Sequence, residues 1–305
     1  MWDNKNNKSL NNIVLHIIIS CYRYSFHYAI KVIVVVTAVQ AFLSCTQKQT
    51  DSPLVSLTLK ETLTRLNNGD VQFYYATYKD SVGGDLTSDL RQKLTSGQLK
   101  REFFINENDS IKEIRVRFLK DSEIFDEIQL RSAMSFPLSG LKFENIDCKK
   151  LQGRIKTAIN NDQQVRFSDT NEQNIFKIDT QNKSLIISII EKCGWLSIDT
   201  AQINDVFLLI QHMDSNIMAR YYPVFIEYYK VGALSNLNFA RMIDRLLMNN
   251  GFEQIYGTQV VDQSFYNIKD VKNVNKRRQE LGLSSIEEAA RRFGFEYKLN
   301  QNLKD

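Results

Sequence analysis

The stretch DTAQINDVFLLIQHMD, residues 199–214, decides how the second half of the chain folds. Its apolar residues recur at helical spacing, which predicts a helix with one buried side running through Met213. Asp199 and Thr200 are residue types that cap the start of a helix. The predicted buried side consists of Ile203, Val206, Phe207 and Ile210.

The flanking sequence predicts more helices, each with its own boundary signal. Thr180 or Asn182 is a candidate cap for one helix, and Gly194 is a natural residue to end it. Pro223 suits the first turn of another. Residues 160–179 are polar and aperiodic. We expect residues 147–305 to form an all-helical domain with helices at Lys183–Lys192, Pro223–Lys230, Leu237–Met248, Val274–Leu281 and Ile286–Phe293.

The first half of the body has a different pattern. A helix is predicted over Leu54–Leu66, because its leucines recur at helical spacing before a glycine. Alternating apolar residues on both sides of the turn cluster Asn106–Ser110 predict a β-hairpin over residues 101–118. Glu123–Phe136 fits a strand or a helix. The expected fold is therefore α+β, with a small N-terminal α+β domain at residues 54–146 and the helical domain after it.

The N-terminus indicates export. Val32–Leu43 is an apolar run of signal-peptide length that follows Lys31. The next residues complete Phe42-Leu43-Ser44-Cys45, which resembles the lipobox of bacterial lipoproteins, with Cys45 as the lipidated residue. Residues 1–45 are then a signal peptide and lipobox, and residues 46–53 a polar tether. This predicts a membrane-anchored protein of the bacterial cell envelope that faces the periplasm.

The apolar stretch that precedes this segment has two explanations. Synthesis that begins near Ile30 from a non-standard start codon would leave a compact signal peptide and lipobox, and an uncleaved membrane anchor is the competing interpretation. Ile13–Ser20 is a second short apolar stretch, and Arg23 and Lys31 would then lie at the membrane edge. Both interpretations attach the protein to a membrane, and they differ in whether Cys45 carries lipid.

Two further cysteines, Cys148 and Cys193, lie in the body of the chain. Their spacing fits no zinc site. A bridge between them is compatible with an oxidising envelope, and two independent buried thiols are the preferred interpretation.

Composition and motif content exclude several classes of function. The formal net charge of +4 is spread along the chain, which argues against nucleic acid as a partner. His212 is the only histidine outside the leader region, so a multi-histidine metal site is excluded and no metal or cofactor is expected. A serine triad would have to use this histidine, and no Gly-x-Ser-x-Gly motif supplies the serine.

Short polar clusters recur beside the apolar segments of the second half. Burying a polar side chain without a partner costs a few kcal/mol, so these clusters predict a polar site. His212 is the candidate acid or base, because histidine titrates near neutrality; its alternative role is to cap the carbonyls at the end of its own helix. The candidate ligand-binding residues are Arg166, Gln211, Asp214, Asp244, Arg245, Gln254, Tyr256, Thr258, Gln259 and Arg278.

Taken in order, these clusters resemble an uncharacterised bacterial family, domain of unknown function family 6624. Leu196 stands where a proline is usual in that family. The resemblance covers about the second half of the chain and implies a list of residues rather than a reaction. It is carried by Asp162-Gln163 with Arg166, Asp179 with Asn182, Gly194-Trp195, Gln211-His212 with Asp214, Asp244-Arg245, Gln254 with Tyr256-Gly257-Thr258-Gln259, Arg277-Arg278 and Leu281-Gly282-Leu283.

Two functional hypotheses remain. In the first, the helical domain of an envelope lipoprotein binds, or binds and hydrolyses, a polar anionic ligand, with Arg166, Arg245 and Arg278 as anion contacts. In the second, the same polar residues form an internal network of a non-catalytic lipoprotein, and the domain at Leu54–Ile146 binds a protein partner. Convergence of His212, Arg245, Tyr256 and Gln259 on an open pocket would favour the first. If these residues lie apart or are each paired internally, the hypothesis of one shared site fails.

Overall fold

The computed structural model describes residues 53–69, 75–135, 143–168 and 171–297. Residues 54–305 form one compact unit. The predicted signal peptide, lipobox and most of the tether lie outside the described residues. None of the helices in the described part of the chain has the length and apolar content that a bilayer crossing requires.

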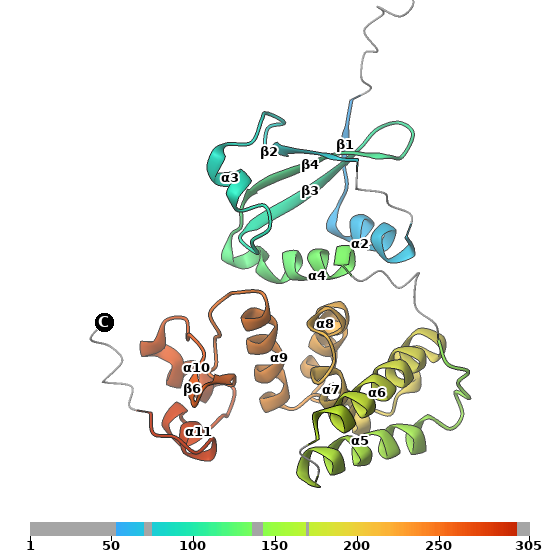
Figure 1. Ribbon diagram of the computed structural model, residues 1–305, viewed down its shortest axis with the longest axis vertical. Helices are drawn as coiled ribbons and strands as arrows, with labels where there is room; N and C mark the ends of the chain where they lie inside the picture. Colours follow the sequence, from blue (N-terminus) through green and yellow to red (C-terminus); the bar gives the residue numbers. More distant parts are fainter. Residues whose placement is uncertain (1–52, 70–74, 136–142, 169–170, 298–305) are drawn as a thin grey trace, which may run out of the picture. The chain divides into compact units, whose positions relative to one another are not determined.

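The first part of this unit is built on a four-stranded mixed sheet with the order β1-β3-β4-β2 (Figure 1). The predicted hairpin is confirmed as β3 and β4, which pair antiparallel around the turn at Asn106–Ser110. β2 runs parallel to β4, and β1 runs antiparallel to β3. The strands are β1 (Val55–Ser56), β2 (Thr77–Asp80), β3 (Leu99–Ile105) and β4 (Ile111–Phe118).

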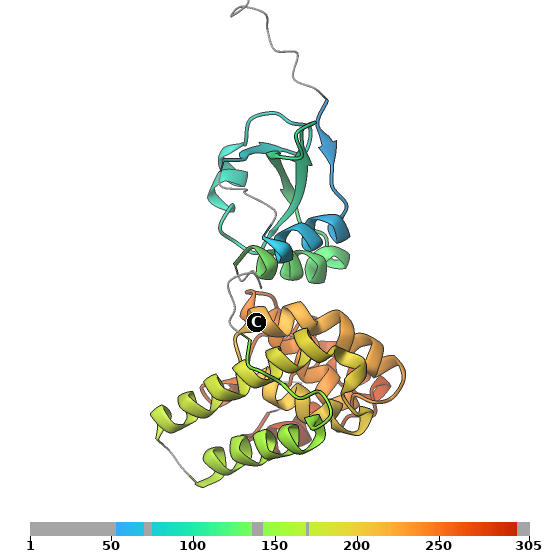
Figure 2. The same cartoon turned by 90° about the vertical axis from the view of Figure 1, so that its right-hand side faces the viewer.

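Helices α2 (Leu59–Asn68), α3 (Ser88–Gln92) and α4 (Ile124–Ser135) complete this part. α2 and α4 lie side by side on one face of the sheet (Figures 1 and 2). α2 begins with a capping box between Thr58 and Glu61 and ends at Gly69, which has a φ of 74°. The segment that fits a strand or a helix is α4. The apolar core of this part is formed by Leu66, Leu90, Leu99, Phe103, Ile111, Ile114, Val116, Leu130 and Ala133.

A buried ion pair joins the sheet to α4. Arg101 on β3 and Glu127 on α4 are 7% and 1% exposed and bond to each other through their side chains. The backbone N–H of Arg101 also donates to Glu127 Oε2 at 3.0 Å. Burial raises the pKa of Glu127 against the opposing effect of Arg101. Removing either side chain would leave the other as an unpaired buried charge, which is strongly unfavourable. The pair therefore fixes the position of α4 on the sheet.

The second part begins with two long antiparallel helices, α5 (Leu151–Ser168) and α6 (Glu172–Cys193), which lie side by side (Figure 2). The expectation that residues 160–179 are aperiodic was wrong, because most of them are helical. α6 starts at Glu172, where the side chain of Asn171 accepts the N–H of Gln173. Thr180 and Asn182, the predicted caps, therefore lie inside the helix. Gly194 ends it as predicted.

A disulfide joins Cys148, just before α5, to Cys193, the last residue of α6. The preferred interpretation of two independent thiols was therefore wrong. The antiparallel packing of α5 and α6 brings the two Cα atoms to 5.6 Å, although the cysteines are 45 positions apart. Sequence spacing does not reveal this proximity, because it depends on where α6 begins and ends.

Helices α7 (Ile203–Gln211), α8 (Ser215–Lys230) and α9 (Asn236–Asn249) form the main core together with α5 and α6. The four predicted core residues of α7 are all fully buried. Pro223 does not start a helix, as was expected, but lies inside α8. A proline inside a helix costs about 3 kcal/mol. Packing on both sides of it offsets this cost, because Phe225 contacts Phe207 edge-on and Tyr222 stacks on Phe125 of α4.

The chain closes with α10 (Val274–Glu280) and α11 (Ile286–Arg292), whose positions agree with the predicted helices. The C-terminal part is largely helical rather than all-helical, because β5 (Val260–Val261) and β6 (Ser264–Phe265) form a small antiparallel ladder before α10. The fold class is thus a mixed sheet with helices followed by a largely helical region. The boundary near Ile146 stays a prediction.

Candidate functional site

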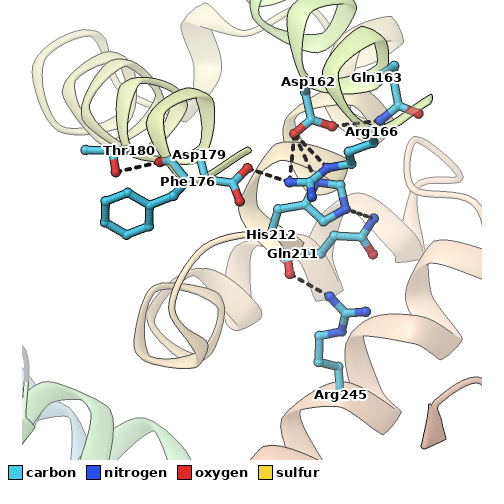
Figure 3. A network of polar contacts seen from close by, with 9 residues as sticks. All are labelled: Asp162, Gln163, Arg166, Phe176, Asp179, Thr180, Gln211, His212 and Arg245. Atoms are coloured by element: carbon cyan, nitrogen blue, oxygen red, sulfur yellow. Dashed lines mark hydrogen bonds and ion pairs between the residues drawn. The ribbon is translucent and has the colours of Figure 1, made fainter. Parts of the chain in front are cut away.

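A buried aspartate and the lone histidine of the body form the centre of the site. Asp162 on α5 is fully buried, and its Oδ1 lies 3.1 Å from Nδ1 of His212, the residue that ends α7 (Figure 3). Gln163 donates to the other oxygen of the carboxylate at 2.7 Å. An ionised Asp162 can only accept, so the hydrogen of His212 lies on Nδ1 when the imidazole is neutral. Nε2 then carries the lone pair and lies 3.5 Å from Nε2 of Gln211.

Arg166 joins this pair to a second carboxylate. It follows Asp162 by one helical turn, and its Nε and Nη2 lie 3.3 and 3.2 Å from Asp162 Oδ1. Nη2 also donates to Asp179 of α6. Figure 3 shows the guanidinium between the two carboxylates. Arg166 therefore ties α5 to α6 and supplies positive charge beside His212.

The pKa values of the two carboxyl groups are shifted in opposite directions. Burial alone would raise the pKa of Asp162, but the hydrogen bonds and charges of His212 and Arg166 outweigh it and lower that pKa. Burial raises the pKa of Asp179, and the negative charge of Asp162 raises it further. The positive charge of Arg166 lowers this pKa but does not cancel the rise. Asp162 is thus held as a carboxylate, while the negative charge of Asp179 is poorly compensated.

The same residues have a donor set that suits a divalent metal ion. Asp162, Asp179 and His212 each offer one ligand atom, and the three atoms lie within 4.8 Å of one another. Carboxylate oxygen and imidazole nitrogen are common metal ligands. Arg166 contacts both carboxylates, however, so its guanidinium already occupies the position of a cation. A metal would have to displace it.

His212 and Asp179 border a pocket of about 490 Å³. Lys183, which is paired with Asp214, brings a positive charge to its wall, and Asp214 precedes the first residue of α8. The apolar part of the wall includes Phe176, whose side chain is largely exposed. The pocket thus offers polar and apolar contacts to one ligand. It is lined by Phe143, Phe176, Asp179, Thr180, Lys183, Ser184, Ile187, His212, Met213 and Asp214.

Arg245 does not reach this pocket. Its Nη1 donates to the backbone oxygen of Gln211 at 2.6 Å, and its Nε donates to Gln259 Oε1 at 3.1 Å. Burial lowers the pKa of Arg245, and the charges of Arg241 and Arg166 add to this effect. Arg245 therefore connects the end of α7 to the loop after α9, and its predicted anion contact stays a prediction.

A separate network surrounds Asp244. This fully buried carboxylate accepts the N–H groups of Ile255, Tyr256 and Thr258 at 2.7, 2.9 and 2.9 Å, and the hydroxyl of Thr258 at 2.9 Å. Burial raises its pKa, while these donors favour the ionised form. Asp244 thus orders the loop from Gln254 to Gln259.

The other residues of this loop are also bonded internally. Gln254 is fully buried and bonds through its amide to the backbone of Gln259 and Tyr266. Arg278 is 3% exposed and donates to the backbone oxygens of Tyr256 and Ser284, both at 2.6 Å. The carboxylate of Asp244 therefore holds the N–H groups of the loop, and Arg278 holds its carbonyls.

The predicted site residues, with His212 as the candidate acid or base, divide into two sets, so His212, Arg245, Tyr256 and Gln259 do not converge on one pocket. Arg166, Gln211, His212 and Asp214 lie around or beside the His212 pocket. The set around the Asp244 loop does not line that pocket and comprises Asp244, Arg245, Gln254, Tyr256, Thr258, Gln259 and Arg278.

The candidate list omitted Asp162, Asp179 and Lys183. Asp162 and Asp179 were noted only as part of the family resemblance. The spacing of Asp162 and Arg166, four positions apart on a helix, was a usable signal, since such residues face each other across one turn.

Comparison with known proteins finds one similarity. Residues 158–302 match the model of a family of unknown function, DUF6624. All the residues discussed in both networks lie within this match. No curated protein and no solved structure was found to match the chain.

Proposed function

We propose that this protein is a cell-envelope lipoprotein whose helical region binds a small polar ligand in the His212 pocket and hydrolyses it with His212 as the general base. The observation that carries the proposal is the 3.1 Å contact between the buried Asp162 and a histidine that lines a pocket. A carboxylate that holds Nδ1–H leaves the lone pair on Nε2, which can accept a proton once the Gln211 amide, 3.5 Å away, gives way to a water molecule.

The reaction follows from this geometry. His212 Nε2 takes a proton from a water molecule as the water oxygen attacks the scissile carbonyl or phosphoryl centre of the ligand. The imidazolium then gives the proton to the leaving group, and the Asp162 carboxylate stabilises the imidazolium meanwhile. No covalent intermediate on the protein is required.

The lining indicates the kind of ligand. Lys183 favours a negatively charged group on the ligand. The carboxylates of Asp214 and Asp179, which also line the pocket, oppose such a group, and Arg166 beside Asp179 offsets part of the second charge. Phe143, Phe176 and Ile187 offer apolar contacts. A polar anionic molecule with an apolar portion fits this combination.

The Cys148–Cys193 disulfide supports the proposed location. Disulfides persist in oxidising compartments such as the bacterial periplasm and are rare in the cytosol. It agrees with the lipobox at Phe42–Cys45. Palmitate labelling of the protein tests the attachment: label is expected on the wild type and absent from Cys45→Ala, and label that survives this change contradicts the lipoprotein proposal.

A second candidate function is a non-catalytic lipoprotein, with the residues at 54–146 as a protein-binding domain. The internal pairing of Asp244, Gln254 and Arg278 favours it, because these residues act as scaffold. In this second candidate function, Asp162 and His212 are scaffold residues as well.

The two candidates are distinguished by the reactivity of His212, because both keep the Asp162–His212 contact and so predict the same tautomer. Once the leader is cleaved, His212 is the only histidine, so ¹⁵N-histidine labelling gives one imidazole spectrum. We expect the Nδ1–H tautomer, its loss in Asp162→Ala, which removes the acceptor, and hydrolysis of p-nitrophenyl acetate or phosphate that His212→Gln abolishes. Equal hydrolysis by the wild type and His212→Gln, or none by either, would contradict the catalytic proposal.

A further inference from the structure

A second pocket lies between α9, the Gly257–Thr258 backbone and the α10–α11 region. Its volume is about 580 Å³. Three arginines line it, Arg241, Arg278 and Arg292, and no aspartate or glutamate is among the lining residues that the structure describes. The remaining lining residues are Leu237, Gly257, Thr258, Gly282, Leu283, Ser284, Ala289 and Phe293.

We infer that this pocket binds the oxyanion group of a small organic anion, with phosphate as the best-matched group. The inference is independent of the function proposed for the His212 pocket, because the two pockets share no lining residue.

Arg241 is the main support for this inference. Its guanidinium is partly buried, and its nearest hydrogen-bond contact is with Asn238 Oδ1 at 3.5 Å, the limit for such a bond. In the described part of the chain, no carboxylate lies within 4.0 Å of it. Burial lowers the pKa of Arg241. A buried charge without a counter-charge is unfavourable, so an anion beside Arg241 would stabilise the fold.

Arg278 adds a second, better-ordered cation. Its Nε and Nη1 hold the carbonyls of Ser284 and Tyr256, which fixes the plane of the guanidinium. In the described part of the chain Nη2 has no hydrogen-bond partner, so it remains as a donor for a ligand. Burial lowers the pKa of Arg278 more than Asp244 raises it. Arg292, which is paired with Glu288 at 2.5 Å, contributes less.

The backbone beside these arginines is held rigidly. Gly257 has a φ of +67°, and a Cβ atom there would lie 2.3 Å from Ile286 Cδ1. Asp244 fixes the next residue, Thr258, through its N–H and hydroxyl groups. The wall of the pocket is therefore preorganised, which lowers the entropic cost of binding a ligand.

The ligand class follows from the lining. A guanidinium presents parallel N–H donors that match the oxygens of phosphate or carboxylate. Leu237, Leu283 and Phe293 provide apolar contacts for the rest of the molecule. An organic phosphate should therefore bind more tightly than inorganic phosphate, and its neutral counterpart should not bind.

Calorimetric titration of the full-length protein in detergent tests this inference. The probes are phenyl phosphate, inorganic phosphate, benzoate and phenol, in a buffer low in other anions. We expect phenyl phosphate to bind most tightly and phenol not to bind. Absence of binding by phenyl phosphate and benzoate, or equal binding of phenol, overturns the inference. If benzoate binds more tightly than phenyl phosphate, the assignment of phosphate as the best-matched group is overturned, because the pocket then prefers a carboxylate.

Matched variants identify the site. Arg241→Gln should weaken phenyl phosphate binding by about tenfold or more, while its thermal unfolding midpoint without ligand stays the same or rises. Arg291→Gln removes the same charge from an exposed residue outside the lining and should bind as the wild type does. All titrations are made in the His212→Gln background, because the function proposed for the His212 pocket would turn over an aryl phosphate probe. Loss of that hydrolysis and loss of this binding are then separate results. Unchanged binding by Arg241→Gln, or a lowered midpoint that shows a structural role, overturns it.

Discussion

Asp162 and His212 are 50 positions apart in the chain, yet the Oδ1 atom of one lies 3.1 Å from the Nδ1 atom of the other. The aspartate comes from the middle of α5 and the histidine from the end of α7. Their contact depends on the packing of α5 against α7. It sets the tautomer of the lone histidine in the body, and so the chemistry available to the pocket.

Replacing Asp162 by asparagine should change His212 while keeping the hydrogen bond at Nδ1, although the Gln163 amide loses its acceptor at Oδ2. An asparagine can still accept from Nδ1, but it cannot stabilise an imidazolium. We expect hydrolysis to fall by two or more orders of magnitude, with a loss of stability of about 1–3 kcal/mol. Turnover and urea unfolding measure the two effects. A purely structural role would show the loss of stability with no selective effect on turnover.

Asp179 predicts a pH dependence of the opposite sign to that of Asp162. The pKa of Asp179 is raised in the folded protein, so its contribution to stability is fully present below about pH 4 and is lost as the pH rises through the folded-state pKa. The lowered pKa of Asp162 contributes stability above about pH 4 that is lost on acidification.

Asp179→Asn should therefore be as stable as the wild type at pH 7, or more stable. Its unfolding free energy should also fall less than that of the wild type between pH 4 and pH 7. Asp262→Asn, on an exposed aspartate with a φ of 49° that asparagine tolerates, is the matched control. Urea unfolding across this range measures the difference, and identical pH profiles for wild type and Asp179→Asn would refute the assignment.

Removing the Arg166 guanidinium should allow the protein to bind a divalent metal ion. Its guanidinium contacts both carboxylates of a potential metal site, so Arg166→Gln should expose Asp162, Asp179 and His212 to a divalent cation. We expect this variant to bind Zn²⁺ or Mn²⁺ more tightly than the wild type does, by calorimetric titration. The double variant Arg166→Gln, His212→Ala should lose that gain. A wild type that binds the metal equally well would show that Arg166 does not hold the cation position.

The Asp244 loop predicts a large effect on stability. Asp244→Ala would leave the N–H groups of Ile255, Tyr256 and Thr258 without their acceptor. Each unsatisfied buried group costs about 1–3 kcal/mol, so a total loss of several kcal/mol is expected. Denaturant unfolding measures it. Asp262→Asn should change stability by less than about 0.5 kcal/mol, and an equally small loss in Asp244→Ala would contradict the scaffold role.

The sequence predicted the elements whose signals are local. The β3–β4 hairpin follows from alternation around one turn, and the buried side of α7 follows from its helical spacing. The polar start of α6 gave no such signal, because an exposed helix needs few apolar residues. Pro223 misled the prediction for α8, since neighbouring aromatic contacts outweigh its local penalty.

The candidate site was predictable only in part, because local sequence patterns do not show which residues meet through tertiary packing. His212 stood out because it is the only histidine of the body, and Arg166 because of its charge. The partners of Asp244 are backbone N–H groups, which no sequence pattern distinguishes. The contact between Asp162 and Asp179 through Arg166 depends on the register of α5 against α6. Tertiary packing therefore separates the pocket residues from the scaffold residues.

The Cys148–Cys193 disulfide predicts that the site depends on the redox state of the compartment. The bridge joins the start of α5 to the end of α6 and closes a loop across 45 positions, so its removal should cost about 2–4 kcal/mol. Asp162 and Asp179 lie inside that loop, on the two helices that it joins. Reduction should therefore lower the thermal midpoint and weaken the Asp162–His212 contact, seen as mixed tautomers in the ¹⁵N spectrum. The double variant Cys148→Ser, Cys193→Ser should behave like the reduced wild type and be insensitive to reductant. Equal midpoints for the oxidised and reduced protein would show that α5 and α6 are held by packing alone.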